Sequence, residues 1–271
     1  MKEEYDIYQI DAFTDSLFAG NPAAVVPLKG EWLSDSVLLN IAAENNLSET
    51  AFFRSRNEPG EYDLRWFTPG VEVDLCGHAT LATAFAIYEL FAGGKCDTDS
   101  VRFHTASGVL EVFRDKDTYF LDFPSRAPKA SKHVLDLSAY FNIRPSFAEE
   151  ARDILFVFEK ESDIRNLIPN HDAIRTLPFF AAIVTAPADP DKPYDFVSRF
   201  FAPAKGVLED PVTGSAHCTL IPYWASRLEK KNLVAYQASQ RGGVLLCEDR
   251  GERVRIGGKA RLFLEGEIRL E

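Results

Sequence analysis

The chain has 271 residues, of which 46% are hydrophobic and 26% are charged. This is the composition of a globular protein and argues against disorder. The formal net charge of −11 argues against a sequence-independent binder of nucleic-acid phosphates, which needs a basic face. A small anionic substrate is still compatible with this charge, because a local site can bind an anion within an acidic protein.

The cysteines and the apolar stretches indicate the cellular compartment of the protein. The four cysteines are scattered without a CxxC pair, and the first residues lack the apolar core of a signal peptide. The longest apolar stretch, near Ala79 to Ala92, is interrupted by Thr83, Tyr88 and Glu89 and is too short to span a bilayer. We therefore expect a cytoplasmic protein with reduced thiols and no membrane partner.

Short strands dominate the first half of the chain. Alternating and β-branched patterns predict strands at residues 5–12, 23–28, 49–54, 62–67, 101–105, 109–113 and 119–123. A helix is predicted from Ser34, a good N-cap residue, to about Asn45. Residues 78–90 differ from the rest because they are apolar nearly all round, which predicts a buried helix.

The second half repeats this plan. Strands are predicted at residues 154–158, 178–185, 196–202, 234–238, 243–247, 253–256 and 259–267, with polar helical segments near 162–167 and 171–176. A second apolar helix begins near Gly214. Phe67-Thr68-Pro69 precedes the first apolar helix and Phe201-Ala202-Pro203 precedes the second, a weak internal repeat that favours two similar lobes.

The starts of the two apolar helices, at Gly77 and Gly214, are candidate anion sites. Free backbone N–H groups and the positive end of the helix dipole bind anions there. If the lobes face each other, both starts can hold a carboxylate or a developing enolate in one cleft. Each glycine alone is better explained as an ordinary turn, but the repetition favours the functional interpretation.

Titratable and nucleophilic groups gather at these starts: Asp74, Cys76 and His78 at the first, and Glu209, Asp210, Ser215 and His217 at the second. Each has a structural alternative. Asp74 or Asp210 can cap a helix, and His217 can be a hydrogen-bonded core histidine. Cys218 and Cys247 are most simply core thiols.

Glu49 is a further candidate, at a helix-to-strand junction beside apolar residues. Apolar surroundings suit a carboxyl group that must both take and give a proton. From the residues alone, an exposed loop acid is the better interpretation.

Other chemistries lack their motifs. The sequence has no Walker loop, no GxGxxG after a first strand, no GxSxG around Ser215 and no HExxH. Cys76-Gly77-His78 is too tight for the usual zinc spacing. We therefore predict no cofactor and no metal.

Six motifs in order resemble the PhzF-type phenazine-biosynthesis family: Asp11-Ala12-Phe13, Gly20-Asn21-Pro22-Ala23-Ala24-Val25, Asn46-Leu47-Ser48-Glu49-Thr50-Ala51-Phe52, Arg65-Trp66-Phe67-Thr68-Pro69, Glu72-Val73-Asp74-Leu75-Cys76-Gly77-His78-Ala79-Thr80 and Glu209-Asp210-Pro211-Val212-Thr213-Gly214-Ser215-Ala216. The likeness runs from near residue 5 to the 257–266 tail and so covers essentially the whole chain.

This resemblance implies the diaminopimelate-epimerase-like fold. That fold is α+β, with two pseudo-symmetric lobes that each wrap a strongly curved, mostly antiparallel sheet or barrel around a central apolar helix. The lobes would be residues 1–123 and 124–261, with a C-terminal strand at about 262–271 returning to the first. The active site would lie between them, and a homodimer is expected.

The resemblance also assigns roles. The family's catalytic glutamate falls on Glu49, which reverses the interpretation from the residues alone, and further active-site positions fall on His78 and Asp210. Substrate-binding positions fall on Asn21, Ser48, Gly77, Ala79, Gly214, Ser215 and Ala216. The implied function is a cofactor-independent isomerase that moves a proton on a small carboxylated metabolite, such as a cyclic diene, by way of a glutamate.

Two alternatives stay open. Epimerases of this fold use one cysteine at each helix start; this chain has Cys76 at the first but Asp210–Ser215 without a cysteine at the second, which disfavours a two-thiol racemase. A helix start can nevertheless lower the pKa of Cys76, which leaves a cysteine-dependent epimerase open. The third hypothesis is a non-catalytic metabolite-binding or interaction protein on the same scaffold.

Overall fold

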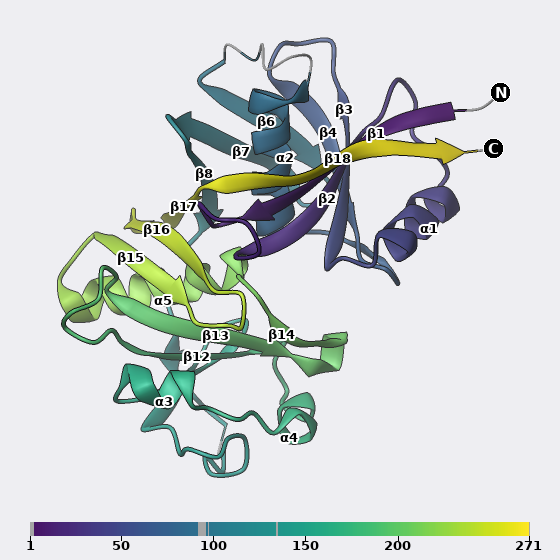
Figure 1. Cartoon of the computed structure of the whole chain (residues 1–271). Helices are drawn as coiled ribbons and strands as arrows, with labels where there is room; N and C mark the ends of the chain where they lie inside the picture. The colour runs from purple at the N-terminus through teal and green to yellow at the C-terminus, as the bar shows by residue number, and fades with distance from the viewer. Residues whose placement is uncertain (1–2, 92–95, 97, 134, 271) are drawn as a thin grey trace. The chain divides into compact units, whose positions relative to one another are not determined.

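The computed structural model describes residues 3–91, 96, 98–133 and 135–270. The chain packs as two compact units, coloured by residue number in Figure 1. Unit 1 comprises the described residues up to Asp122 and those from Gly257 onward, and unit 2 comprises Phe123–Ile256. The predicted lobes, residues 1–123 and 124–261 with a returning strand at about 262–271, stay a prediction as domains.

Unit 1 is built mostly of strands. They are β1 (Glu3–Ala12), β2 (Asn21–Pro27), β3 (Glu49–Ser55), β4 (Glu61–Phe67), β5 (Glu72–Val73), β6 (Ser100–Thr105), β7 (Gly108–Asp115), β8 (Thr118–Pro124) and β18 (Ala260–Leu270). Adjacent strands run in the order β18–β1–β2–β3–β4–β6–β7–β8, and β5 pairs with the end of β4. Only β2–β3 and β4–β6 are parallel pairs in this series.

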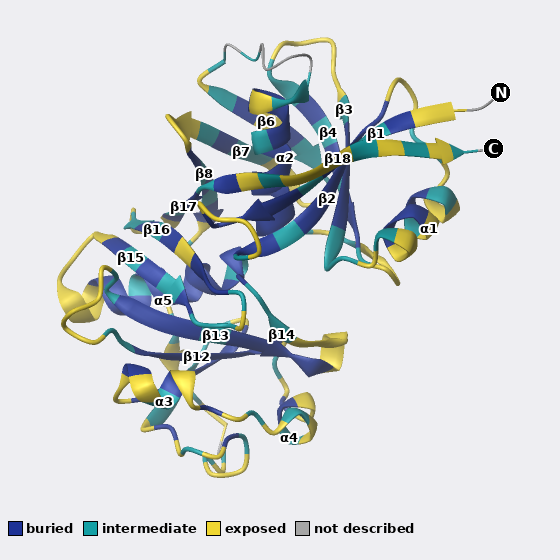
Figure 2. Ribbon diagram, viewed as in Figure 1, coloured by how far each residue is buried: buried dark blue, intermediate teal, exposed yellow. Residues whose placement is uncertain are grey.

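Two helices make the crossovers that these parallel pairs require. Helix α1 (Asp35–Asn45) joins β2 to β3, and α2 (Gly77–Glu89) joins β5 to β6. Helix α2 contacts β1, β2, β3 and β18, and 11 of its 13 residues are buried. It is therefore the central helix of the unit, as its uniformly apolar sequence predicts (Figure 2).

Unit 2 has the same kind of construction. Its strands are β9 (Lys129–Ala130), β10 (Phe147–Glu150), β11 (Ile154–Val157), β12 (Ala182–Pro187), β13 (Phe196–Ala202), β14 (Val207–Asp210), β15 (Asn232–Gln237), β16 (Gly243–Asp249) and β17 (Arg253–Gly258). Its helices are α3 (Glu161–Arg165), α4 (His171–Arg175), the short 3-10 helix η2 (Pro203–Lys205) and α5 (Gly214–Leu228). Helix α5 continues across Pro222 and contacts β15 and β16.

The strand pairing shows the internal repeat directly. Parallel pairs β2–β3 and β4–β6 of unit 1 correspond to β11–β12 and β13–β15 of unit 2. In the antiparallel pairs between them, Thr50 lies opposite Phe67 and Ala182 lies opposite Phe201, so the two aromatic–proline motifs hold the same register. The predicted α+β class with pseudo-symmetric, mostly antiparallel sheets around apolar helices is confirmed.

One predicted strand is misplaced. The sequence predicts a strand over residues 178–185, but β12 spans Ala182–Pro187. Its partner β11 begins at Ile154, which pairs with Ala182, so no ladder is available further upstream. Pro178 also lacks the N–H group that a ladder uses.

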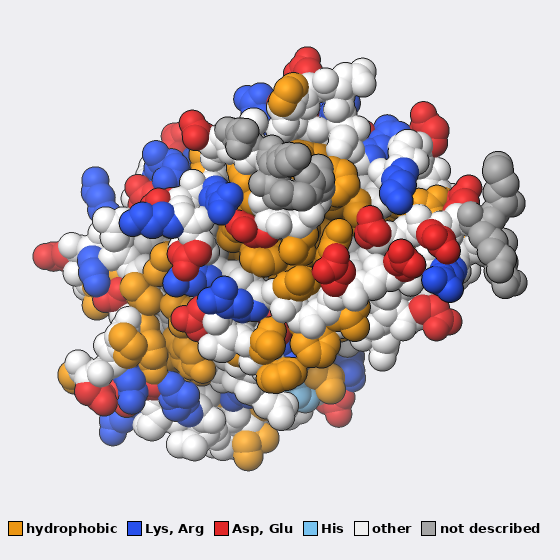
Figure 3. All heavy atoms as spheres, turned by 45° about the horizontal axis from the view of Figure 1, so that its top comes forward, with side chains coloured by type: hydrophobic (Ala, Val, Ile, Leu, Met, Phe, Trp, Pro, Cys, Tyr) orange, Lys and Arg blue, Asp and Glu red, His pale blue; other side chains and the backbone are white. Residues whose placement is uncertain are grey.

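The face shown in Figure 3 carries both acidic and basic side chains, and groups of apolar side chains lie between them. One exposed apolar contact joins Phe18, which is 70% exposed, to Phe263 of β18, with ring centroids 5.8 Å apart. No helix in the described part of the chain combines the length and apolar character that a membrane crossing requires.

Asp153, in the turn before β11, should make stability depend on pH. Its residue is 1% exposed, and burial raises its pKa to about 6 against the opposing charges of Arg152 and Arg126. The folded pKa exceeds the unfolded value, so this contribution is complete below about pH 4 and is lost as the pH rises through 6. When the pH rises from 4 to 8, the free energy of unfolding of the wild type should therefore fall by about 3 kcal/mol relative to that of Asp153→Asn, which has no titrating group at this position.

Urea denaturation at several pH values measures this difference. The exposed Asp191 provides the matched control, because Asp191→Asn should follow the wild type throughout. Parallel pH profiles for Asp153→Asn and the wild type would contradict the prediction.

Candidate active site

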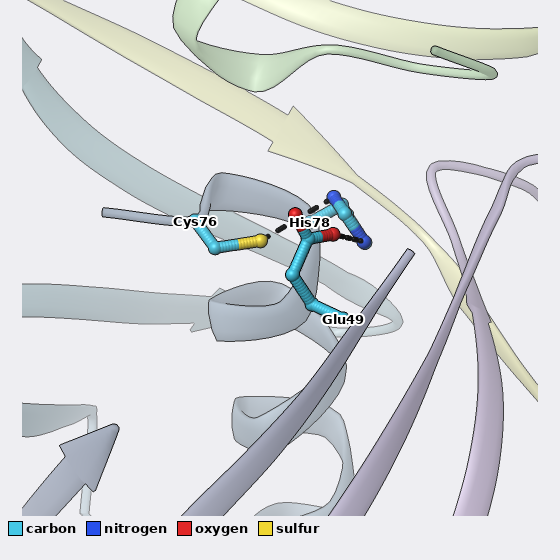
Figure 4. Close-up of side chains that lie close together, drawn as sticks. All are labelled: Glu49, Cys76 and His78. Atoms are coloured by element: carbon cyan, nitrogen blue, oxygen red, sulfur yellow. Dashed lines mark hydrogen bonds and ion pairs between the residues drawn. The ribbon is translucent and has the colours of Figure 1, made fainter. Parts of the chain in front are cut away.

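The site of unit 1 is assembled where three elements begin. Asn21 is the first residue of β2, Glu49 the first of β3, and His78 the second of α2. Strands β2 and β3 are parallel, with Ala23 opposite Glu49, so their starts lie at the same edge of the sheet. The sheet edge therefore brings Asn21 and Glu49 to the polar end of the buried helix (Figure 4 shows Glu49 beside it).

Local structure explains the position of Glu49. Helix α1 ends at Asn45, and Asn46 takes a left-handed conformation (φ 49°) that turns the chain toward β3. Asparagine tolerates this conformation better than most residues. The Asn45 amide donates a hydrogen bond to Thr50 Oγ1 at 3.0 Å, which ties the helix end to the strand and holds Glu49 between them.

His78 is the hub of the side-chain contacts. Its Nε2 lies 3.1 Å from Glu49 Oε2, and its Nδ1 lies 3.2 Å from Asn21 Nδ2 and 3.5 Å from Cys76 Sγ. The His78 and Glu49 side chains are 6% and 17% exposed, so a nearly desolvated imidazole faces a carboxylate that keeps some access to solvent (Figure 4). These are an acid–base pair and a thiol within one contact network.

Burial and neighbouring charges set the ionisation of His78. Burial acts to lower its pKa, but Cys76 and Glu49 act to raise it, and the net direction is well above the ordinary value. Of the two groups that raise the pKa, Cys76 has the larger effect and the Glu49 carboxylate, 3.1 Å from Nε2, has the next.

The pKa lowering expected for Cys76 at a helix start is wrong. Burial raises the pKa of the Cys76 thiol to about 11, and the nearby charge of Glu49 acts in the same direction. Contacts with His78 and with the backbone N–H of Ala79 act to lower the pKa, but they are the smaller effects. Cys76 is therefore a neutral thiol at physiological pH.

The corresponding start in unit 2 is held by a different network. Thr213 is the N-cap residue of α5, and its hydroxyl donates a short hydrogen bond to Asp210 Oδ2. Buried Gln237 accepts from the Thr213 backbone N–H at 2.8 Å and donates to the Asp210 carbonyl at 2.8 Å. Asp210 thus bonds to the side chain of the N-cap residue, and Ser215 is half-buried on the first turn.

His217 and Cys218 of α5 and Cys247 of β16 belong to the core. His217 is fully buried, its Nδ1 donates to the Thr213 carbonyl at 2.8 Å, and burial lowers its pKa to about 4. Burial also raises the pKa of Cys218 to about 11 and that of Cys247 further. The structural alternatives for these residues are confirmed.

The remaining predicted substrate positions lie at the same two helix starts or beside Glu49. Gly77 and Ala79 are buried in the first turn of α2, Gly214 and Ala216 are buried in the first turn of α5, and Ser48 is half-buried directly before Glu49. Their roles as substrate contacts stay predictions. A donor atom of Glu49, one of Cys76 and one of His78 lie within 4.8 Å of one another, an arrangement suited to a metal ion.

Two serines, not identified from the sequence, brace the helix starts. Ser107 Oγ donates to the Asp74 carbonyl at 2.8 Å, and Ser239 Oγ donates to the Pro211 carbonyl at 2.7 Å. Both acceptors lie three residues before a helix glycine, and both serines follow an alanine directly after a strand. The repeated Ala-Ser pair after β6 and β15 is the signal that could have found them.

The repeat also shows which chemistry is confined to unit 1. By the strand registers, Ala181 of unit 2 corresponds to Glu49, and by the helix glycines Thr213 and Ser215 correspond to Cys76 and His78. Unit 2 therefore carries neither the carboxylate–imidazole pair nor a thiol at the corresponding positions. This asymmetry disfavours the two-thiol mechanism.

A hollow of about 840 Å³ lies elsewhere in unit 1, among residues of β3, β4 and β6. Its charged lining is internally paired: Arg54 contacts Asp63 at 2.8 Å, and Arg102 contacts Glu61 at 3.1 Å. Both pairs are only partly exposed. The hollow contains none of the predicted site residues, and we interpret it as a solvated groove.

The comparisons with known proteins agree on one family. The model described as PhzC-PhzF, phenazine biosynthesis-like protein, matches residues 10–266. An uncharacterized isomerase of Pseudomonas aeruginosa is 48% identical and covers 98% of this chain and 100% of its own. A crystal structure of a PhzF-family phenazine biosynthesis protein from Enterococcus faecalis superposes with a TM-score of 0.93 at 44% identity, covering 99% of this chain and 100% of that chain.

A more distantly related solved structure has the same fold. The structure of a predicted epimerase from Pseudomonas aeruginosa has a TM-score of 0.74 at 20% identity, covers 97% of this chain and 99% of its own, and shares the architecture alone. The resemblance and fold class predicted from the sequence are confirmed by these findings. The general prediction of an isomerase is confirmed as well, since several relatives carry that name.

The raised pKa of Cys76 predicts slow alkylation. A pKa near 11 gives a thiolate fraction roughly 100-fold smaller at pH 7.5 than an ordinary cysteine with a pKa of 9.0. Peptide mass spectrometry after timed iodoacetamide treatment should find Cys76 far less modified than half-buried Cys96. The Cys76 rate should still be rising tenfold per pH unit above pH 9, and a plateau below pH 8 would indicate a thiolate.

Proposed function

This chain belongs to the phenazine biosynthesis-like protein family, and from that premise we propose that it is a cofactor-independent isomerase with Glu49 as its proton carrier. Its substrate would be a small carboxylated metabolite, of which a cyclic diene is one type. The observation that carries the proposal is the Glu49–His78 pair, a carboxylate 3.1 Å from a buried imidazole at a helix start.

The proposed reaction returns the proton that it removes. The Glu49 carboxylate takes a proton from an sp3 carbon next to a conjugated system, and the C–H electron pair enters that system to give a delocalised anion, such as a dienolate. The resulting Glu49 carboxylic acid then delivers the proton to another carbon of the same system. No electrons leave the substrate, so the net change is an isomerisation that needs no redox cofactor.

His78 would position the carboxylate. Its Nε2 lies 3.1 Å from Glu49 Oε2, and its Nδ1 accepts from the Asn21 side-chain amide at 3.2 Å in the tautomer that carries the proton on Nε2. A positioned base contributes more to proton transfer than a mobile one, because the reacting atoms must lie within about 3–3.5 Å.

Substrate binding is proposed for the helix-start groups. Backbone N–H groups at Gly77 and Ala79 of α2, and at Gly214 and Ala216 of α5, are suited to a carboxylate or an enolate oxygen. Ser215 adds a hydroxyl donor at the start of α5, and Asp210 would orient the substrate or assist the transfer. Asn21 and Ser48 complete the proposed contacts.

A cysteine-dependent epimerase is the weaker candidate. Cys76 lies 3.5 Å from His78 Nδ1, but its raised pKa disfavours the thiolate base and Thr213 occupies the corresponding place in unit 2. A homodimer in the cytoplasm remains part of our proposal on the basis of the family resemblance, and light scattering tests the oligomeric state.

The central prediction concerns Glu49→Gln, which keeps the side chain's shape but removes its basicity. Carboxylated metabolites are first screened for exchange of carbon-bound hydrogen in deuterated water, because exchange reports proton abstraction whatever product is formed. With a substrate found in this way, Glu49→Gln should reduce exchange and turnover by about 10²–10⁴-fold.

Glu44→Gln is the matched control, because Glu44 is an exposed glutamate of α1 five residues earlier and should keep wild-type rates. Undiminished turnover by Glu49→Gln would refute the proton-carrier role. Ligand binding without turnover or exchange by the wild type would instead support a binding protein.

A separate prediction concerns Ser215. If its hydroxyl donates to a substrate carboxylate, loss of this charged hydrogen bond in Ser215→Ala should raise KM by roughly 10- to 100-fold and change kcat much less. Ser226→Ala is the control, since Ser226 is exposed near the end of the same helix. Equal KM values for the two variants would remove Ser215 from the binding site.

A further inference from the structure

We propose that Glu49, Cys76 and His78 form a binding site for Zn²⁺ and other thiophilic divalent cations, and that the bound ion inhibits the enzyme. One donor atom of each residue lies within 4.8 Å of the other two (Figure 4). Thiolate, imidazole and carboxylate are the three ligand types that zinc takes in proteins. The inhibitory part rests on the proposed role of Glu49, whereas the binding part does not.

The spacing of two donors already matches zinc. Zinc–sulfur and zinc–nitrogen bonds of about 2.3 Å and 2.0–2.1 Å, at a tetrahedral angle, separate the two donor atoms by about 3.6 Å. Cys76 Sγ and His78 Nδ1 are 3.5 Å apart. An ion can therefore join these two atoms without moving the backbone of α2.

Glu49 is placed to supply the third ligand from another element. It begins β3, and one of its carboxylate oxygens belongs to the set of three donor atoms that lie within 4.8 Å of one another. Its 3.1 Å contact is with His78 Nε2, the ring nitrogen that an ion on Nδ1 does not use. Its side chain has rotatable bonds that allow an oxygen to close the remaining distance. The short spacing Cys76-Gly77-His78 is unusual for zinc ligands. With Glu49 from a separate strand, however, the set reaches three protein ligands and leaves one coordination position open, as in catalytic zinc sites.

Charge balance favours the occupied state. Binding replaces the Cys76 thiol proton, so the thiolate and the Glu49 carboxylate together neutralise the divalent ion. The released proton goes to solvent. The ion also displaces the Asn21 amide from His78 Nδ1, which costs about 0.5–1.5 kcal/mol, the contribution of one ordinary hydrogen bond.

Inhibition follows from the same contacts. A carboxylate bound to a divalent ion is a much weaker base toward the substrate proton, and the ion occupies the edge where the substrate would lie. The site would therefore act as a trap for excess metal.

Cadmium titration of the full-length, chelator-treated protein tests binding without a substrate. Cadmium bound by a thiolate gives an ultraviolet charge-transfer absorption, and we expect one equivalent per chain. Cys76→Ser should abolish the signal, with Cys76→Ala as a second variant if the serine protein fails to fold. Glu49→Gln and His78→Gln should each weaken Zn²⁺ binding, measured by calorimetry, on the order of 100-fold.

Cys96→Ser is the matched control and should keep the wild-type absorption, since Cys96 lies outside the cluster. Absorption that survives in a folded Cys76 variant, or Zn²⁺ affinities unchanged in both other variants, would overturn the site. If the ion binds as described but wild-type turnover persists at saturation, the inhibition and the role of Glu49 fail together while the metal site stands. If no ion binds and Glu49→Gln is inactive, the metal site alone fails.

Discussion

The enclosure of α2 is the constraint on which the site of unit 1 depends. A helix that is apolar on every side must be covered on every side, and β1, β2, β3 and β18 provide contacts that do so. Its first turn is then the place where backbone N–H groups lack helical partners. Because β2 and β3 are parallel and begin at this end, Asn21 and Glu49 meet His78 there. The chemistry thus lies where the packing of the helix leaves polar groups to be satisfied.

The two units share their strand pairing and helix starts but differ in the side chains at the corresponding positions. Ser107 and Ser239 make the same hydrogen bond to the loop before each central helix, so the same device fixes both helix starts. The residues that the frame presents differ: unit 1 has Glu49 where unit 2 has Ala181. Only unit 1 has a carboxylate at this pair of corresponding positions. This favours a mechanism in which one group both removes and returns the proton, and it disfavours a mechanism with two opposed bases.

The sequence predicts the architecture well because its signals are local. The apolar run at residues 78–90 and the aromatic–proline motifs are readable within a few positions. Gln237 is not identifiable in this way, because its importance comes from contacts with Asp210 and Thr213, which are more than 20 residues away and join it only through the fold. Glu49 is assigned by resemblance and not by its pattern, since nothing local distinguishes it from an exposed acid.

The expected lowering of the Cys76 pKa is wrong because the effect of the helix start is smaller than the effect of burial. A helix N-terminus stabilises a negative charge by about 0.3–1 kcal/mol, which is less than one pKa unit. Burial and the Glu49 charge act in the opposite direction, and the net rise from 9.0 to about 11 corresponds to roughly 3 kcal/mol. The exposure of a thiol therefore decides its ionisation here, and exposure is a property of packing that the motif does not contain.

The same balance explains why a proton carrier and a metal trap can share three residues. Cys76 is a neutral thiol because burial raises its pKa. A thiolate would add a negative charge beside Glu49, which burial opposes. A divalent ion that displaces the thiol proton compensates this charge, because two positive charges then face one thiolate and one carboxylate. The low polarity that keeps Cys76 protonated is thus also what makes a dication an effective replacement for its proton.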